Sequence, residues 1–142
     1  MIKNRKKNQL LFLMIINISL TGCFNSKANE CGKIIKVSDK LAEITQANLK
    51  IQDVNQLLKI ADNFDQSAQQ ILDKNLKNEK LIDYSKKLGR IYKNYGQITR
   101  NFITAFQTKD TEKAILYKQE IFKLSQEEKT LVENINSYCQ QN

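Results

Sequence analysis

The chain lacks histidine altogether, and its 142 residues include neither proline nor tryptophan. Without histidine it has neither the commonest general base nor the usual metal ligand, and Ser-His or Cys-His dyads cannot form. The Glu-x-x-His pairs that di-iron helix bundles use are excluded for the same reason. We therefore expect no enzymatic activity, no metal site and no cofactor.

Other features are scarce rather than absent. Only four glycines occur, so the chain has few helix breakers. Its three cysteines form no CxxC or CxxCH motif, which removes support for thioredoxin-like redox chemistry and for c-type haem attachment. Acidic residues are outnumbered, with 15 Asp and Glu against 23 Lys and Arg and a formal charge of +8.

The N-terminus has the layout of an export signal. Four cations and no acid precede an apolar run from Leu10 to Leu20, namely Lys3, Arg5, Lys6 and Lys7. A run of this length rises about 16 Å as a helix, about half of a ~30 Å hydrocarbon core, so it is too short for a stable transmembrane helix. Two alternatives are an N-terminal core helix of a cytosolic protein and an ordinary cleaved signal that leaves a soluble secreted protein.

The stretch Leu20-Thr21-Gly22-Cys23 closes the apolar run and resembles the lipobox of bacterial lipoproteins. The resemblance implies that residues 1–22 are a signal peptide that is removed and that Cys23 becomes an acylated N-terminus. Residues 23–28 would then be a short tether to the membrane. The protein would lie on the extracytoplasmic side, at a periplasmic, outer-membrane or lumenal face.

The remaining cysteines, Cys31 and Cys139, lie near the two ends of the mature chain. Disulfides persist in exported proteins, so we expect these two residues to be bridged. Such a bridge would close a loop of about 110 residues, for which chain entropy predicts on the order of 4–5 kcal/mol of stabilisation. The alternative is a pair of unpaired, buried thiols.

The rest of the chain is predicted to be helical, because apolar residues recur three and four apart. We expect helices over about 29–48, 53–73, 78–107 and 111–140, with Asp53 and Asp110 as N-caps and Leu76 packed beneath the loop at 75–78. Short connections favour an antiparallel up-down-up-down four-helix bundle spanning 29–142. In that topology Cys31 and Cys139 are neighbours. The expected core positions are Ile34, Val37, Leu41, Ile44, Val54, Leu57, Leu58, Ala61, Phe64, Ala68, Ile71, Leu72, Leu81, Leu88, Tyr92, Tyr95, Phe102, Phe106, Ala114, Tyr117, Ile121, Leu124, Glu128, Leu131, Ile135 and Tyr138.

Some residues within the helices carry further predictions. Gly89 and Gly96 lie seven apart on the third helix and predict close approach of a neighbouring helix. Glu128 falls among the core positions of the fourth helix, while Asp62 and Asp65 flank those of the second. Each carboxylate could serve an ion or ligand site, or it could reach the bundle edge and pair with a lysine.

The third helix is the most basic part of the mature chain. Its cations Lys86, Arg90, Lys93 and Arg100 recur on one outward face, opposite its apolar side. This face could dock an acidic protein or anionic headgroups, or it could be a solvated surface that keeps the domain soluble. Loss of the four signal-peptide cations lowers the formal charge of the mature chain from +8 to +4. Nucleic acid is not an expected partner, because an exported protein works outside the cytoplasm.

Four segments carry a second resemblance. They are Leu81-Ile82-Asp83-Tyr84, Ile91-Tyr92-Lys93, Asn101-Phe102-Ile103-Thr104-Ala105-Phe106 with Lys109-Asp110, and Val132-Glu133-Asn134-Ile135-Asn136-Ser137-Tyr138-Cys139. Together they resemble an uncharacterised family of small cyanobacterial lipoproteins, which implies a source and a location but no activity. The architecture is also similar to that of the extrinsic Q subunit of photosystem II, without a motif that aligns.

These patterns predict an exported, lipid-anchored bundle that binds or scaffolds at a membrane surface. One alternative is an accessory subunit of a membrane complex, for example a photosynthetic one. The other is a carrier with a slot between helices for a small apolar ligand, lined by the aromatic residues of the third helix.

Overall fold

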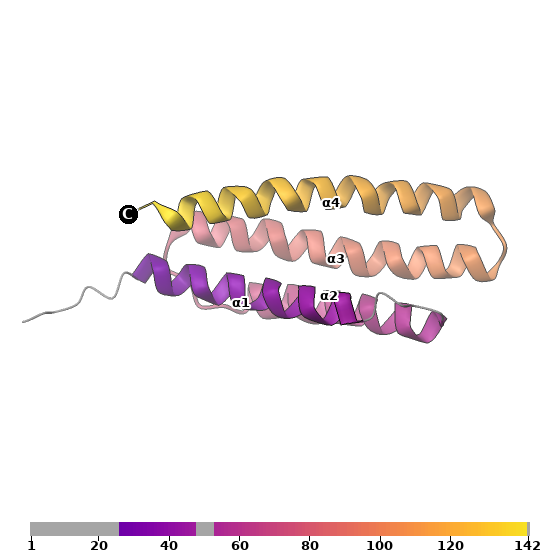
Figure 1. Cartoon of the computed structure of the whole chain (residues 1–142), viewed down its shortest axis with the longest axis horizontal. Coiled ribbons are helices and arrows are strands. Elements are labelled where there is room, and N and C mark those ends of the chain that lie inside the picture. The colour runs from indigo at the N-terminus through magenta and orange to yellow at the C-terminus, as the bar shows by residue number, and fades with distance from the viewer. Residues whose placement is uncertain (1–25, 48–52, 142) are drawn as a thin grey trace, which may run out of the picture.

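A computed structural model describes residues 26–47 and 53–141. In these residues the protein is all-α and forms a four-helix bundle, as predicted. The helices are α1 (Ser26–Ala47), α2 (Val54–Leu72), α3 (Glu79–Gln107) and α4 (Thr111–Gln140). Figure 1 shows that they alternate in direction, so the start of α1 and the end of α4 lie at the same end of the bundle.

The start of α1 differs from the prediction. The helix begins at Ser26, so the last three residues of the predicted tether, 26–28, are its first turn. The predicted signal peptide and Cys23 lie outside the described residues. No described helix is both long enough and apolar enough to cross a membrane.

Side-chain caps fix where three of the helices begin. Asp53 accepts a hydrogen bond from the backbone N–H of Asn55 at 3.1 Å, and Asp110 accepts one from Lys113 at 3.1 Å, which confirms both predicted N-caps. Asn78, predicted as the first helical residue, is instead the cap of α3 and accepts from the N–H of Leu81. Each cap satisfies a backbone donor that the first helical turn leaves free.

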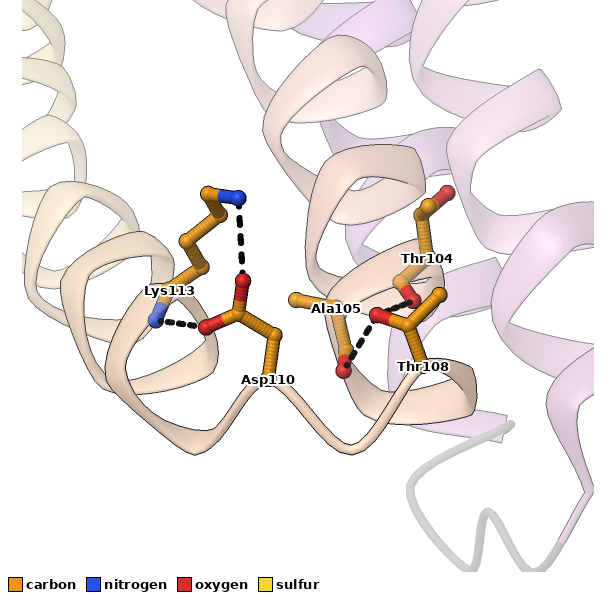
Figure 2. A network of polar contacts seen from close by, with 5 residues as sticks. All are labelled: Thr104, Ala105, Thr108, Asp110 and Lys113. Carbon is orange, nitrogen blue, oxygen red and sulfur yellow. Dashed lines mark hydrogen bonds and ion pairs between the residues drawn. The ribbon is translucent and has the colours of Figure 1, made fainter.

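The turn between α3 and α4 is closed by hydrogen bonds on both sides (Figure 2). The N–H of Asp110 donates to the carbonyl of Ala105 at 2.8 Å and that of Lys109 donates to Phe106 at 3.1 Å, the two bonds of a Schellman motif. Lys109 takes the left-handed conformation, with φ of 58°, that this motif requires. A short, fully bonded turn of this kind holds α4 antiparallel to α3.

Half of the predicted core residues are buried and most of the others are partly buried, because the helical faces meet at the bundle axis. Leu76 is also buried beneath its loop, as predicted. Three predicted core residues are exposed: Leu58 is 37% exposed, Leu72 is 39% exposed and Phe106 is 64% exposed. Phe106 lies in the last turn of α3, at the end of the bundle, where it contacts the ring of Phe102.

The two glycines of α3 allow α2 to approach closely, as predicted. A Cβ added at Gly96 would lie 3.0 Å from the backbone carbonyl oxygen of Ala61 and 2.6 Å from a carboxylate oxygen of Asp65. A Cβ at Gly89 would lie 2.9 Å from the side chain of Leu72. The α2–α3 pair is the most extensive helix contact in the described residues.

Candidate functional site

The end of the bundle where α1 begins and α4 ends is joined covalently. Cys31 in α1 and Cys139 in α4 form a disulfide, with an S–S distance of 2.05 Å and a Cα–Cα distance of 6.0 Å. The structure thus confirms that the up-down-up-down topology brings these residues together. We call this region, including Glu30, Asn78 and Tyr138, the disulfide end.

Glu30 holds the α2–α3 loop against α1. Its side chain is only 5% exposed, and its carboxylate accepts hydrogen bonds from the backbone N–H groups of Lys77 at 3.1 Å and Asn78 at 3.0 Å. These donors precede α3, where a negative charge is also favoured by the helix dipole. Glu30 was not among the residues predicted from the sequence.

Tyr138 adds a second set of contacts at the disulfide end. Its hydroxyl exchanges hydrogen bonds with the side chain of Asn78, at 2.9 and 3.1 Å. The ammonium groups of Lys27 and Lys80 lie 4.4 and 4.8 Å from the centre of the tyrosine ring, within cation–π range. The start of α1, the start of α3 and the end of α4 are therefore linked by side chains as well as by the disulfide.

Lysines are concentrated around the disulfide end. Lys27 and Lys80 flank Tyr138, and Lys33 donates to the carbonyl of Asn75 in the α2–α3 loop at 3.2 Å. The same loop carries Lys74 and Lys77. The exposed acids beside them are Asp73 and Glu79, so these five lysines outnumber the acids at the surface there, because the Glu30 carboxylate is buried against backbone donors.

The predicted basic face of α3 is smaller than expected. Lys86, Arg90 and Lys93 are exposed, and they form no ion pair with another described residue. Arg100 turns toward α2 instead, because the carboxylates of Asp62 and Asp65 lie 2.6 and 2.7 Å from its guanidinium. The prediction that four cations share a face without acids is therefore wrong for Arg100.

Asp62 and Asp65 are accounted for by the same pairing. The hydrogen bond to Asp62 has the largest effect and raises the pKa of Arg100; burial opposes it, and the hydrogen bond to Asp65 adds to the rise. All three side chains are partly exposed, so the cluster contributes modestly to stability. The described residues contain no group of three or more acidic or cysteine side chains that could hold a metal ion.

A cavity of about 350 Å³ opens between the helices, and we call it the slot. All four helices line it, with α1 contributing most of one wall and Glu128 standing on α4. The lining residues are Ser38, Leu41, Ala42, Thr45, Gln46, Phe64, Tyr92, Tyr95 and Glu128. Its first lining residue on α1, Ser38, lies seven residues, or about two helical turns, after Cys31 of the disulfide.

Three aromatic side chains form the inner wall of the slot. The rings of Phe64 and Tyr95 are stacked with centroids 4.7 Å apart, and Phe64 also lies 6.0 Å from Tyr92 at a tilt. Tyr92 is 1% exposed, and its hydroxyl donates to the Ser38 hydroxyl at 3.1 Å. Each ring of this wall therefore contacts another ring, and that of Tyr92 is also held by a hydrogen bond.

Glu128 is the acid at the predicted core position, and it is half-buried beside Tyr92 and Tyr95. Burial raises the pKa of its carboxyl, while hydrogen bonding from Tyr95 and then Tyr92 opposes this effect. Burial also raises the pKa of both tyrosines, and the negative charge of Glu128 raises both further. No lysine or arginine lines the slot, and Glu128 forms no ion pair with any other residue that the structure describes.

Comparison of the chain with protein-family models, curated proteins and solved structures finds no match. The resemblance to cyanobacterial lipoproteins therefore stays a prediction, and the disulfide end, the basic face and the slot are the three candidate functional regions of the described residues.

Proposed function

We propose that this protein is an exported lipoprotein, anchored through acylated Cys23, whose helix bundle binds at a membrane surface without catalysing a reaction. The observation that carries the proposal is the disulfide end. Its bridged cysteines suit an exported compartment, and α1 begins only three residues after Cys23. With so short a connection, an acyl anchor would hold the disulfide end against the membrane.

The lysines of the disulfide end support an anionic lipid surface as the first partner. A single acyl chain gives marginal attachment, so stable anchoring uses a second signal such as another chain or a basic patch. Each lysine close to the surface of an anionic membrane contributes about 1 kcal/mol to the free energy of membrane binding. Lys27, Lys77 and Lys80 would lie within this range when the anchor is engaged.

The exposed cations of α3 support the alternative of an accessory subunit of a membrane complex. Lys93 lies about 20 Å along α3 from its first residue, at ~1.5 Å per residue, which is beyond the ~10 Å screening length at 0.1 M salt. Arg90 and Lys93 would therefore face a protein surface rather than lipid, with Lys86 at the boundary of the screening length. An acidic face on a neighbouring membrane protein, for example one of a photosynthetic complex, would complement them.

The anchor is tested by mass spectrometry of the mature N-terminus from native membranes. We expect the chain to begin at Cys23 and to carry acyl chains. Replacing Cys23 by alanine should leave the signal uncleaved or release the protein from the membrane. An unmodified N-terminus at another residue would refute the anchor.

The lipid partner is tested by sedimentation with vesicles of phosphatidylcholine, with and without phosphatidylglycerol. We expect the anionic lipid to increase binding and added salt to reduce it. Changing Lys27, Lys77 and Lys80 together to glutamine should remove this increase, whereas changing Lys118 and Lys123 on α4 should not.

The accessory-subunit alternative makes a different prediction. Reversing Arg90 and Lys93 to glutamate should leave vesicle binding intact and reduce co-purification with proteins of the native membrane. If co-purification is unchanged across a salt series, the α3 face is only a solvated surface.

A second candidate function, a carrier of a small ligand, is favoured by the slot. Its aromatic wall and its single carboxylate are features of a binding site rather than of a uniformly apolar core.

A further inference from the structure

The carboxylate of Glu128 has more acceptor positions than the protein fills. An ionised carboxylate offers about four lone-pair sites, and the only donors beside it in the described residues are the hydroxyls of Tyr95 and Tyr92. The single proton of the Tyr92 hydroxyl is directed to Ser38. Tyr95 is therefore the main donor, which leaves acceptor positions of the carboxylate for a ligand in the slot that Glu128 lines.

The charge of Glu128 is likewise uncompensated. Three other acids in the described residues face donors: Glu30 accepts from two backbone N–H groups, and Asp62 and Asp65 pair with Arg100. Glu128 has tyrosine hydroxyls and no cation, although burial makes an unpaired charge costly. The slot thus presents a negative charge with free acceptor positions next to an aromatic wall.

We propose that the slot binds an organic ammonium ion, a primary amine whose N–H groups bond to Glu128 and whose hydrocarbon or aromatic body packs on Phe64, Tyr92 and Tyr95. A primary ammonium supplies three donors and a positive charge, which match what the carboxylate lacks. The aromatic faces favour a nearby cation and an apolar body alike. A cavity of about 350 Å³ accommodates an amine of drug-fragment size.

Other ligand classes fit the slot less well. A neutral apolar ligand would displace water from the carboxylate and leave its charge unpaired, which is costly. An anion would be repelled by Glu128. A divalent metal would find one carboxylate where it needs several oxygen ligands, and the described residues provide no second acid in the slot.

This inference deepens the second candidate function and is independent of the anchor. Binding of an amine in the slot requires neither acylation of Cys23 nor the lysines of the disulfide end. Failure of the amine test would leave the anchoring proposal standing, and failure of the anchor test would leave the amine site standing.

The test is isothermal titration calorimetry of the protein purified from its native membrane, with a blank titration into the same detergent. Three probes share a phenylalkyl body and differ in charge: 2-phenylethylammonium, 2-phenylethanol and 3-phenylpropanoate. We expect the ammonium to bind at least about tenfold more tightly than the alcohol, because hydrogen bonds between charged groups are the stronger ones. The carboxylate probe should bind weakest.

Two variants place the binding in the slot. Glu128→Gln should lower the binding affinity for 2-phenylethylammonium by about tenfold and leave the affinity for 2-phenylethanol unchanged, because only the charge is removed. Ala42→Phe fills the rim of the slot from α1 without changing any charge, and it should block all three probes. Glu133→Gln removes an exposed acid from the same helix and should change nothing.

Each possible result either supports or overturns the proposed amine site. A preference for the ammonium that Glu128→Gln and Ala42→Phe abolish, and Glu133→Gln does not, supports the site. Equal affinity for the three probes, no heat of binding with any of them, or an ammonium affinity unchanged in Glu128→Gln overturns it. Circular dichroism of each variant checks that the fold is retained, and if Glu128→Gln fails to fold, Ala42→Phe still decides the matter.

Discussion

Replacing Glu30 by glutamine is expected to destabilise the protein by about 2–3 kcal/mol. The carboxylate accepts from the N–H groups of Lys77 and Asn78 in a site that is 5% exposed. Glutamine has nearly the same shape, but one of its two terminal atoms is a donor. One backbone N–H would therefore keep a partner, while the other would face an NH₂ group.

The magnitude follows from the kind of hydrogen bond that is lost. A hydrogen bond to a charged group contributes about 1.5–3 kcal/mol, and a buried donor left without a partner costs about 1–3 kcal/mol. Glutamine is uncharged, so the variant avoids the desolvation cost of a buried carboxylate, and this offsets part of the lost stability. A net change of about 2–3 kcal/mol is a large share of the 5–15 kcal/mol that typically stabilises a small domain.

Two assays check the prediction with the disulfide intact. Urea denaturation followed by circular dichroism gives the change in the free energy of unfolding, and hydrogen exchange reports on the individual amides. In Glu30→Gln the amides of Lys77 and Asn78 should exchange faster than in the parent. Glu79→Gln, at an exposed acid in the first turn of α3, serves as the matched control and should change stability by less than about 0.5 kcal/mol.

The reasoning would be refuted if Glu30→Gln lay within 0.5 kcal/mol of the parent, on the order of an ordinary surface change. It would also be refuted if the two amides exchanged at unchanged rates. Either result would mean that the loop is held by packing alone and that the buried carboxylate contributes nothing to it.

Three further predictions concern the disulfide, the helix contact and the slot. Changing Cys31 and Cys139 together to alanine should lower stability by about 4–5 kcal/mol, because the bridge closes a loop between residues 108 apart, and urea denaturation measures this loss. Gly96→Ala should destabilise by about 1–3 kcal/mol through overpacking against the α2 backbone, whereas Gly89→Ala should be nearly neutral because it meets only a flexible, partly exposed side chain. The raised pKa of Glu128 means that folding favours its protonated form. The stability that this protonated carboxyl contributes is therefore present below the ordinary glutamate pKa of 4.5, and it is lost as the pH rises through the raised pKa. Glu128→Gln should accordingly be more stable than the parent at neutral pH and not in acid.

Each of these has a contrary outcome that can be observed. Two reactive thiols in the denatured, unreduced protein would show that the bridge is absent. Equal effects at the two glycines would show that the contact with the backbone of α2 is looser than described. A stability difference between Glu128→Gln and the parent that stays constant with pH would show that the carboxyl titrates as a solvated group.

The fold could be predicted from the sequence because its signals are local. Hydrophobic periodicity, the absence of proline and the capping residues Asp53 and Asp110 give helix ends that lie within three residues of those observed. Topology then follows from the short connections. The pairing of Cys31 with Cys139 was predictable for the same reason, since an even number of helices returns the chain to its starting end.

The side-chain contacts between different helices, in contrast, could not be predicted from such local signals. Glu30 reaches donors 47 and 48 residues away, and Arg100 reaches Asp62 across 38 residues. Periodicity states which face of a helix is apolar, but it does not state how far each helix is rotated toward its neighbour. Gly96 and Arg100 both face α2, and only the packed structure reveals this and the slot that the acid at position 128 lines.

The disulfide has a consequence for a chain that is cut. The turn at residues 108–110 lies at the opposite end of the bundle from the bridge, and Lys109 within it is exposed (Figure 1). A protease that cleaves after Lys109 would divide the backbone into two pieces, with Cys31 in one and Cys139 in the other. The nicked protein would migrate as a single species on a non-reducing gel and as two fragments after reduction. A break in the backbone at this turn therefore does not release α4, and the two halves remain one molecule for as long as the bridge is oxidised.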